Sequence, residues 1–177
     1  MPSDFGPKSA ENSHLSDLGC YGPSIDPCHL RLHDIGEVLR REGLKQGFVP
    51  LSEYKVGIRP GGKGTAKVDW VWRNGDGQVI AAFEIEGRDA AYKSAGHPSL
   101  IADHWKLMQL RSARKWLVLF QVDHDLGPKA NRGGFDYRAE ASRALNAMGP
   151  HDIRVAMDVD FWDPRFRCGL AASVPGA

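Results

Sequence analysis

The middle of the chain holds two neighbouring stretches whose patterns fit β-strands, residues 67–73 and 79–87. In the second stretch, every other side chain is apolar and defines one face, while the opposite face ends in two carboxylates, Glu84 and Glu86. Side chains of a strand point alternately to its two faces, so this pattern predicts a strand with one apolar face. The sequence Asn-Gly-Asp-Gly at 74–77 predicts a tight turn that pairs the two stretches as an antiparallel hairpin.

Helical and strand periods predict further elements on both sides of this hairpin. Gly43 is expected to end a short helix whose inner side carries Ile35, Val38, Leu39 and Glu42. A nearly continuous apolar run at 115–122 is typical of a buried central strand. The other predicted elements are a strand at 49–58, a helix beginning after Ser99, a helix at 137–148 and a strand at 153–161. The order is α-β-β-β-α-β-α-β, which predicts an α/β fold with a mixed sheet flanked by helices.

The two ends of the chain lack this periodicity. Residues 1–27 are rich in Gly, Pro, Ser and Asp and are expected to form an irregular arm. Residues 28–167 fit a single domain, because a chain of 177 residues is long enough to bury one core. Residues 168–177 are expected to form a C-terminal tail without helix or strand.

Composition narrows the class of protein. Hydrophobic residues make up 42% of the chain and charged residues 25%, as in ordinary globular domains. No run of about 18 apolar residues occurs, which predicts no membrane contact through a span, and the N-terminus lacks the pattern of a secretory signal. Three cysteines without CxxC spacing favour reduced thiols in a cytoplasmic protein.

Signals for a nucleic-acid partner are present but have ordinary alternatives. Net charge is +1, yet residues 88–115 hold six Lys and Arg against two Asp. A basic stretch suits a phosphate backbone, and a solvated helix face fits the same pattern. Trp70 and Trp72 share one face of their strand and are expected to pack into the core, with base stacking as the alternative.

Asp69 adds a third carboxylate, because the predicted hairpin brings it beside Glu84. Burying an unpaired carboxylate is costly, and one divalent cation neutralises several carboxylates. The alternative is a surface cluster in which the carboxylates pair with a neighbouring cation, namely Lys67, Arg73 or Arg88. Ile80 and Ala82 share the face of the two glutamates, which indicates that this face is covered near its start and favours a metal site.

These residues resemble the motif of the PD-(D/E)xK nuclease superfamily, which has the restriction-endonuclease-like fold. The resemblance covers residues 30–122, with Val68-Asp69 and Phe83-Glu-Ile-Glu86 as the motif, followed by the helix after Ser99 and the strand at 116–122. It implies an α-β-β-β-α-β core and a Mg²⁺-dependent endonuclease, with Mn²⁺ as a substitute, that hydrolyses DNA phosphodiester bonds with a metal-activated water. It also implies that Asp69 and Glu84 are metal ligands.

Glu86 departs from the motif, because it stands where the family usually has lysine. Certain type II restriction enzymes also carry glutamate there, so the resemblance implies that Glu86 is a ligand of the metal or the base that activates the water. A lysine from elsewhere would then supply the missing positive charge. Lys106 on the following helix is the first candidate and Lys93 the second, while a solvent-facing Lys106 is the alternative.

The family often adds a glutamate from the first helix, and two residues compete for this position. Glu37 fits by place in the sequence, but the helical period puts it opposite the apolar side and therefore outward. Glu42 lies on the inner side instead. The sequence leaves this assignment open between them.

The resemblance leaves two classes of function. The first is a DNA endonuclease that works as a homodimer or with a specificity partner protein. The second is a non-catalytic module that keeps the fold and binds nucleic acid or a protein, which the missing motif lysine favours. A metal-dependent hydrolase of another phosphoester fits the same carboxylates.

Overall fold

A mixed β-sheet organises the structure, which is a computed structural model that describes residues 32–58, 62, 64–88, 98–111, 113–120 and 136–171. The five strands of this part of the chain lie in the order β1-β2-β3-β4-β5. Their bounds are β1 Val49–Ile58, β2 Thr65–Arg73, β3 Val79–Gly87, β4 Arg114–Phe120 and β5 Ile153–Met157. The helices are α1 Leu32–Lys45, α3 Pro98–Met108, α4 Tyr137–Ala147, the 3₁₀ helix η2 Asp158–Trp162 and α5 Pro164–Gly169.

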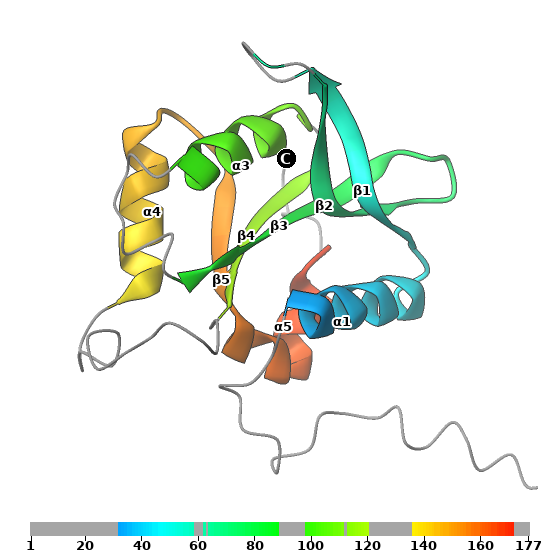
Figure 1. The fold of residues 1–177 in the computed structure, drawn as a ribbon. Coiled ribbons are helices and arrows are strands. Elements are labelled where there is room, and N and C mark those ends of the chain that lie inside the picture. Colours follow the sequence, from blue (N-terminus) through cyan, green and yellow to red (C-terminus); the bar gives the residue numbers. More distant parts are fainter. Residues whose placement is uncertain are drawn as a thin grey trace, which may run out of the picture.

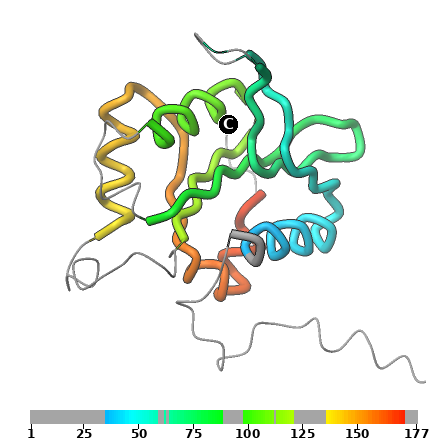
Figure 2. The backbone as a smooth tube through the Cα atoms, viewed as in Figure 1, coloured from blue at the N-terminus to red at the C-terminus, as the bar shows by residue number. Residues whose placement is uncertain are grey.

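The strand directions follow from the connections between strands. The first three strands form an antiparallel meander, and β3, β4 and β5 run parallel to one another. Parallel neighbours need a crossover, and α3 and α4 supply the two crossovers (Figure 1). The colours of Figure 2 follow this path from β3 through α3 to β4, and the orange β5 forms one edge of the sheet. The predicted α/β fold is confirmed, and its element order is consistent with a restriction-endonuclease-like core.

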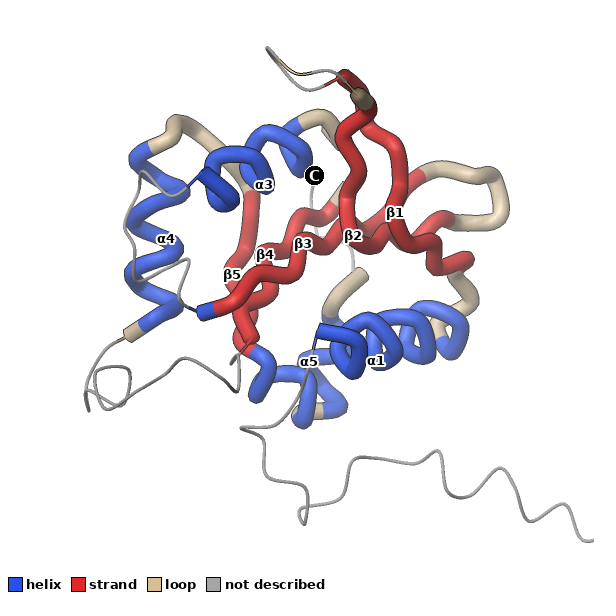
Figure 3. The backbone as a smooth tube through the Cα atoms, viewed as in Figure 1, coloured by secondary structure: helices blue, strands red, loops and turns tan. Residues whose placement is uncertain are grey.

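Helices cover both faces of the sheet, as Figure 3 shows. On one face, α3 and α4 enclose an apolar core that includes Leu100, Leu117 and Leu145. On the other face, α1 and the C-terminal helices enclose a second core around Trp72 and Phe83. The sheet is therefore the middle of three layers. No helix in the described part of the chain has the length and apolar character that crossing a membrane requires.

Gly43 does not end the first helix, contrary to prediction. Helix α1 continues to Lys45, and the chain turns at Gly47, where φ is +82°. A Cβ on Gly43 would lie 2.7 Å from Nε1 of Trp72, and this Nε1 donates a hydrogen bond to the carbonyl of Leu39 at 3.0 Å. Gly43 therefore allows α1 to approach the buried indole closely, and packing outweighs its low helix propensity.

The last predicted strand is also wrong beyond Met157, because η2 and α5 follow it. Asp160 accepts a hydrogen bond from the backbone N–H of Met157 at 2.7 Å, and Asp158 accepts one from the N–H of Val159. Side chains that bind nearby backbone N–H groups compete with a strand ladder, so the strand ends there. The expected tail is structured at its start, since α5 reaches Gly169 and Leu170 is fully buried. Asp163 caps α5 and Pro164 starts it, a signal that the sequence already carried.

The remaining predicted elements agree with the structure to within a few residues. The strands predicted at 49–58 and 79–87 coincide with β1 and β3, and the turn at 74–77 joins β2 to β3. The predicted arm at 1–27 and Lys93 lie outside the described residues, as do residues 121 and 122 of the predicted central strand.

Candidate carboxylate site

Asp69 lies where β2 separates from β3. The pairing of the two strands begins at Trp70 and Phe83, one residue after Asp69. Beyond this pair, Oδ2 of Asp69 accepts a hydrogen bond from the backbone N–H of Ile85 at 2.8 Å. A side chain thus replaces a backbone ladder bond, and it holds the carboxylate of Asp69 against the strand that carries Glu84.

Lys106 reaches the same place from α3. Its ammonium donates to Oε2 of Glu84 at 2.5 Å and lies 2.8 Å from Oδ1 of Asp103. The exposed fractions of the three residues are 8% for Lys106, 1% for Glu84 and 3% for Asp103. Lys106 is therefore buried against the predicted site, and the alternative of a solvent-facing lysine is wrong.

Buried oxygen atoms in this group still lack partners. Among the described residues, Oε1 of Glu84 and Oδ2 of Asp103 are shielded from solvent and receive no hydrogen bond from an N–H group. Each side chain lies beside another carboxyl group, Glu84 beside Asp69 and Asp103 beside Glu86. Buried polar atoms without partners are uncommon and costly in native proteins. Glu84 and Asp103 each bind the Lys106 ammonium through one oxygen, and this ammonium is shared by a group of neighbouring carboxyl side chains.

The pKa values of Asp69, Glu84 and Glu86 in this cluster are raised, and the cluster has more carboxyl groups than cations. Burial raises the pKa of Glu84, and repulsion from Asp103 and Asp69 adds to the rise. Burial and then Asp103 raise the pKa of Glu86 to about 7. Burial also raises the pKa of Asp69, despite its bond from Ile85. These four carboxyl groups share the charge of Lys106, whose pKa burial alone would lower but Asp103 and Glu84 raise.

The donor set fits a hard divalent cation, although the side chains are not arranged around one. Within the described ranges, no three His, Cys, Asp or Glu side chains form a ready metal-binding group. Glu84 and Asp103 instead bind the Lys106 ammonium, which takes the place of a counter-ion. Mg²⁺ and Mn²⁺ prefer carboxylate oxygens, and the two unpartnered oxygens of Glu84 and Asp103 are atoms of this kind.

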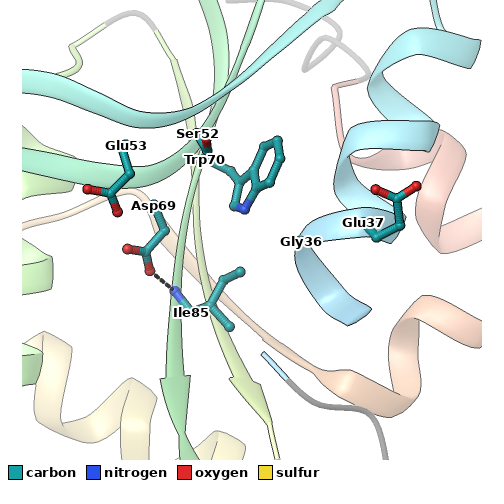
Figure 4. A pocket seen from close by; sticks show the side chains of 7 residues that line it. All are labelled: Gly36, Glu37, Ser52, Glu53, Asp69, Trp70 and Ile85. Atoms are coloured by element: carbon teal, nitrogen blue, oxygen red, sulfur yellow. Dashed lines mark hydrogen bonds between the residues drawn. The ribbon is translucent and has the colours of Figure 1, made fainter. Parts of the chain in front are cut away.

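A pocket of about 370 Å³ opens on another side of Asp69, between α1 and the β1–β2 hairpin. Its lining consists of Gly36, Glu37, Ser52, Glu53, Asp69, Trp70 and Ile85 (Figure 4). In Figure 4, Glu37 stands on α1, across the pocket from Glu53 and Asp69. The pocket lining and the Lys106 cluster thus meet at Asp69.

The two candidate glutamates of α1 face the sides that the helical period predicted, and only Glu37 lies beside the site. Glu37 is partly exposed, as predicted, but it lines the pocket together with Asp69. Arg40 and Arg41 bind its two oxygens at 2.7–2.8 Å and hold the pKa of Glu37 down at about 2. Glu42 is buried as predicted, but it binds Gln46 at 3.0 Å and does not line the pocket.

Asp103 and Glu53 are site residues that the sequence analysis missed. Asp103 carried a signal, because its spacing from Leu100 and Leu107 places it on the inner side of its helix. A carboxylate on that side needs a partner, and Lys106 lies one turn further along α3. Glu53 carried no such signal, since its place depends on an unusual backbone angle, a φ of +54°.

Comparison with known proteins adds no relative. No protein family model, no curated protein and no solved structure matches the chain.

Proposed function

We propose that the chain is a metal-dependent nuclease that hydrolyses DNA phosphodiester bonds with Mg²⁺, or Mn²⁺ in its place. The observation that carries the proposal is the Lys106 cluster, in which carboxyl groups from β2, β3 and α3 gather around one buried ammonium. The resemblance of the hairpin to the PD-(D/E)xK motif supports the same reaction. A buried ion pair that only stabilised the fold would not need carboxyl groups in excess of its cation.

Each residue of the cluster has a separate role in the proposed reaction. Asp69 and Glu84 would hold the cation, and a bound Mg²⁺ polarises a phosphate oxygen and lowers the pKa of water. Glu86 has a pKa raised to about 7, so near neutral pH it is available to accept the proton of the attacking water. The ammonium of Lys106, held in place by Asp103, offers positive charge to the phosphate as negative charge develops.

The surroundings of the cluster also suit a DNA strand. Arg40, Arg41 and Lys67 are all partly exposed and ion-paired to residues that line the neighbouring pocket. Exposed cations beside a hydrolytic site are typical of proteins that bind a phosphate backbone. A reducing, cytoplasmic setting belongs to the same proposal, since free Cys168 is exposed.

A cleavage assay tests the proposal directly. Wild-type protein is incubated with supercoiled plasmid or single-stranded DNA in Mg²⁺, Mn²⁺ or EDTA, beside Glu84→Gln, Glu86→Gln and Lys106→Met. We expect metal-dependent cleavage that Glu84→Gln abolishes and Glu86→Gln lowers by about 10²–10⁴-fold. Glu140→Gln is the matched control, because Glu140 is a glutamate on the outer surface of α4, paired with Arg143.

The outcomes separate the two classes of function. Cleavage that persists in EDTA or in Glu84→Gln would exclude the proposed site. DNA binding without cleavage in any metal, unchanged in Glu84→Gln, would instead indicate a non-catalytic binding module.

A further inference from the structure

The wall of the pocket beside Asp69 includes a local departure from strand geometry. Successive side chains of a regular strand point to opposite faces, yet Ser52 and Glu53 of β1 both line the pocket (Figure 4). Glu53 has a φ of +54°, which a residue other than glycine rarely adopts within a strand. Strained backbone of this kind tends to occur at functional sites, where the surroundings hold it in place.

Trp70 gives the pocket an aromatic wall. Its side chain is partly buried, packs against the core around Trp72 and also lines the pocket. A Cβ on Gly36 would lie 2.9 Å from Nε1 of Trp70, so α1 abuts the edge of this indole. The close approach fixes the indole at the pocket, and the ring is available for a planar group to stack on it.

The charges of the pocket select against an anion inside it and favour one at its rim. Among the described residues, the polar side chains of the lining are Glu37, Glu53, Asp69 and Ser52 together with the indole N–H, and none of these is a cation. The cations that pair with these carboxylates are Arg40 and Arg41 for Glu37 and Lys67 for Glu53. All three cations have side chains about 45% exposed, so phosphates outside the pocket can reach them.

We infer that this pocket binds one unpaired nucleobase of a DNA strand, stacked on Trp70, with an exocyclic amino group donated to Glu53 or Glu37. The inference rests on the proposed nuclease function and names its substrate class, DNA that is single-stranded or locally unpaired near the cut. A volume of about 370 Å³ lies in the lower part of the range of ligand pockets and is large enough for one nucleobase. Adenine, cytosine and guanine carry amino donors and thymine does not, so carboxylate acceptors favour the first three.

The arrangement connects base binding to the reaction through Asp69, which belongs to both the pocket lining and the carboxylate cluster. A base held on Trp70 places its own sugar and phosphates at the pocket mouth. The rim cations then bind flanking phosphates, in the manner of single-strand binding surfaces that combine aromatic stacking with positive charge.

Fluorescence anisotropy with labelled oligonucleotides in EDTA tests the inference without any cleavage. The probes are oligo-dA, oligo-dC, oligo-dT and a fully abasic strand of equal length, together with a paired duplex. We expect tighter binding of dA and dC than of dT, and weakest binding of the abasic strand and the duplex. Trp70→Leu is expected to weaken dA binding on the order of 10-fold or more, while Trp70→Phe keeps most of it. Glu53→Gln is expected to reduce the preference for dA over dT.

Trp105→Leu is the matched control, because Trp105 is a partly buried tryptophan on α3 that does not line the pocket. Unchanged dA binding in Trp70→Leu, or abasic binding equal to dA binding, overturns the inference. If Trp70→Leu is unfolded by circular dichroism, Glu53→Gln decides through the base preference alone. Base-dependent binding without cleavage in Mg²⁺ would overturn the proposed nuclease and leave the pocket standing. If the protein cleaves paired duplex and Trp70→Leu does not diminish this cleavage, the base-binding inference is overturned and the proposed nuclease stands.

Discussion

Two groups of carboxylates meet at Asp69, and they differ in how their negative charge is neutralised. In the Lys106 cluster, two buried carboxyl groups (Glu84 and Asp103) and two half-buried ones (Asp69 and Glu86) share one buried ammonium. In the described part of the chain, one oxygen of Glu84 and one of Asp103 receive no hydrogen bond from an N–H group. In the pocket, Glu37 has two arginines of its own and Glu53 pairs with Lys67. The first group is short of positive charge, and the second is neutralised by partly exposed cations.

The pKa values follow this difference in burial and pairing. Burial raises the pKa of Glu86 to about 7, whereas the Arg40 and Arg41 guanidinium groups lower the pKa of Glu37 to about 2. Near neutral pH, a glutamate side chain is therefore partly protonated at Glu86 and fully ionised at Glu37. We infer that the cluster is suited to bind a cation or move a proton, and the pocket carboxylates to orient neighbours.

Removing the shared ammonium is the sharpest way to break this comparison. Lys106→Met should lower the free energy of unfolding by about 3–5 kcal/mol at neutral pH in EDTA, because it leaves buried carboxyl groups without a counter-charge. Lys67→Met, which breaks the exposed pair with Glu53, should cost at most about 1 kcal/mol. Urea denaturation of both variants measures the difference.

A further test of the Lys106 cluster uses the metal itself. If Mg²⁺ takes over the counter-charge, adding it should recover part of the stability that Lys106→Met loses, with no comparable effect on Lys67→Met. Equal losses in the two variants would mean that the buried cluster is no more sensitive than a surface pair.

Two glycines of α1 give the next largest effect. Gly43→Ala forces a Cβ to within 2.7 Å of the fully buried Trp72, and Gly36→Ala forces one to within 2.9 Å of the partly buried Trp70. We expect Gly43→Ala to destabilise the protein by about 1–3 kcal/mol, as overpacked cores do. Gly36→Ala should cost less, because Trp70 can move toward the open pocket.

Thermal unfolding followed by circular dichroism measures both glycine variants. Oligonucleotide binding separates them further, since a displaced Trp70 should weaken dA binding in Gly36→Ala alone. A larger loss of stability in Gly36→Ala than in Gly43→Ala would contradict the idea that the pocket is open space.

Local patterns were enough to predict most of the fold. Alternation defined β3, a continuous apolar run defined β4 and a turn sequence defined the hairpin, since each depends on neighbours within a few residues. The prediction failed at Gly43, where a tryptophan from β2 decides the packing, and after Met157, where Asp158 and Asp160 end the strand. Long-range packing and side-chain bonds to the backbone leave little trace in a periodicity.

The candidate site divides in the same way. Asp69, Glu84 and Glu86 could be grouped from strand pairing alone, and Lys106 could be suggested because the motif lacked a lysine. Glu37 was a candidate by its place in the sequence, but the helical period argued against it, because a helical period separates core from solvent and does not indicate a pocket at the flank of the helix. Glu53 could not be predicted, since nothing in the sequence indicates the positive φ of +54° at this position of β1.

The pH dependence of stability sharpens the comparison further. The pKa of Glu86 rises on folding from 4.5 to about 7, so the folded state binds this proton more tightly than the unfolded state. The resulting stabilisation is fully present below about pH 4.5 and is lost as the pH rises through about 7. We expect a loss of about 1–2 kcal/mol across this window, after allowance for partial exposure.

Denaturant unfolding of metal-free protein at a series of pH values measures this loss. The difference between wild type and Glu86→Gln isolates the contribution of Glu86, because glutamine does not titrate. A difference that stays constant across the window would show that Glu86 ionises alike in the folded and unfolded states.

The smallest effect is expected at Glu37, whose pKa is lowered. Its stabilisation has the opposite sign with pH, being present above about 4.5 and lost as the pH falls through about 2. Because the pairs with Arg40 and Arg41 are exposed, Glu37→Gln should lower the midpoint of thermal unfolding by only about 2 °C, and less in high salt. Glu37→Gln should change oligonucleotide binding in EDTA more than it changes stability. The binding should weaken, because the two arginines lose the carboxylate that orients them at the pocket rim. A loss of cleavage in Glu37→Gln with unchanged DNA binding would instead place Glu37 among the groups that act on the metal or the phosphate, and would join the two regions into one site.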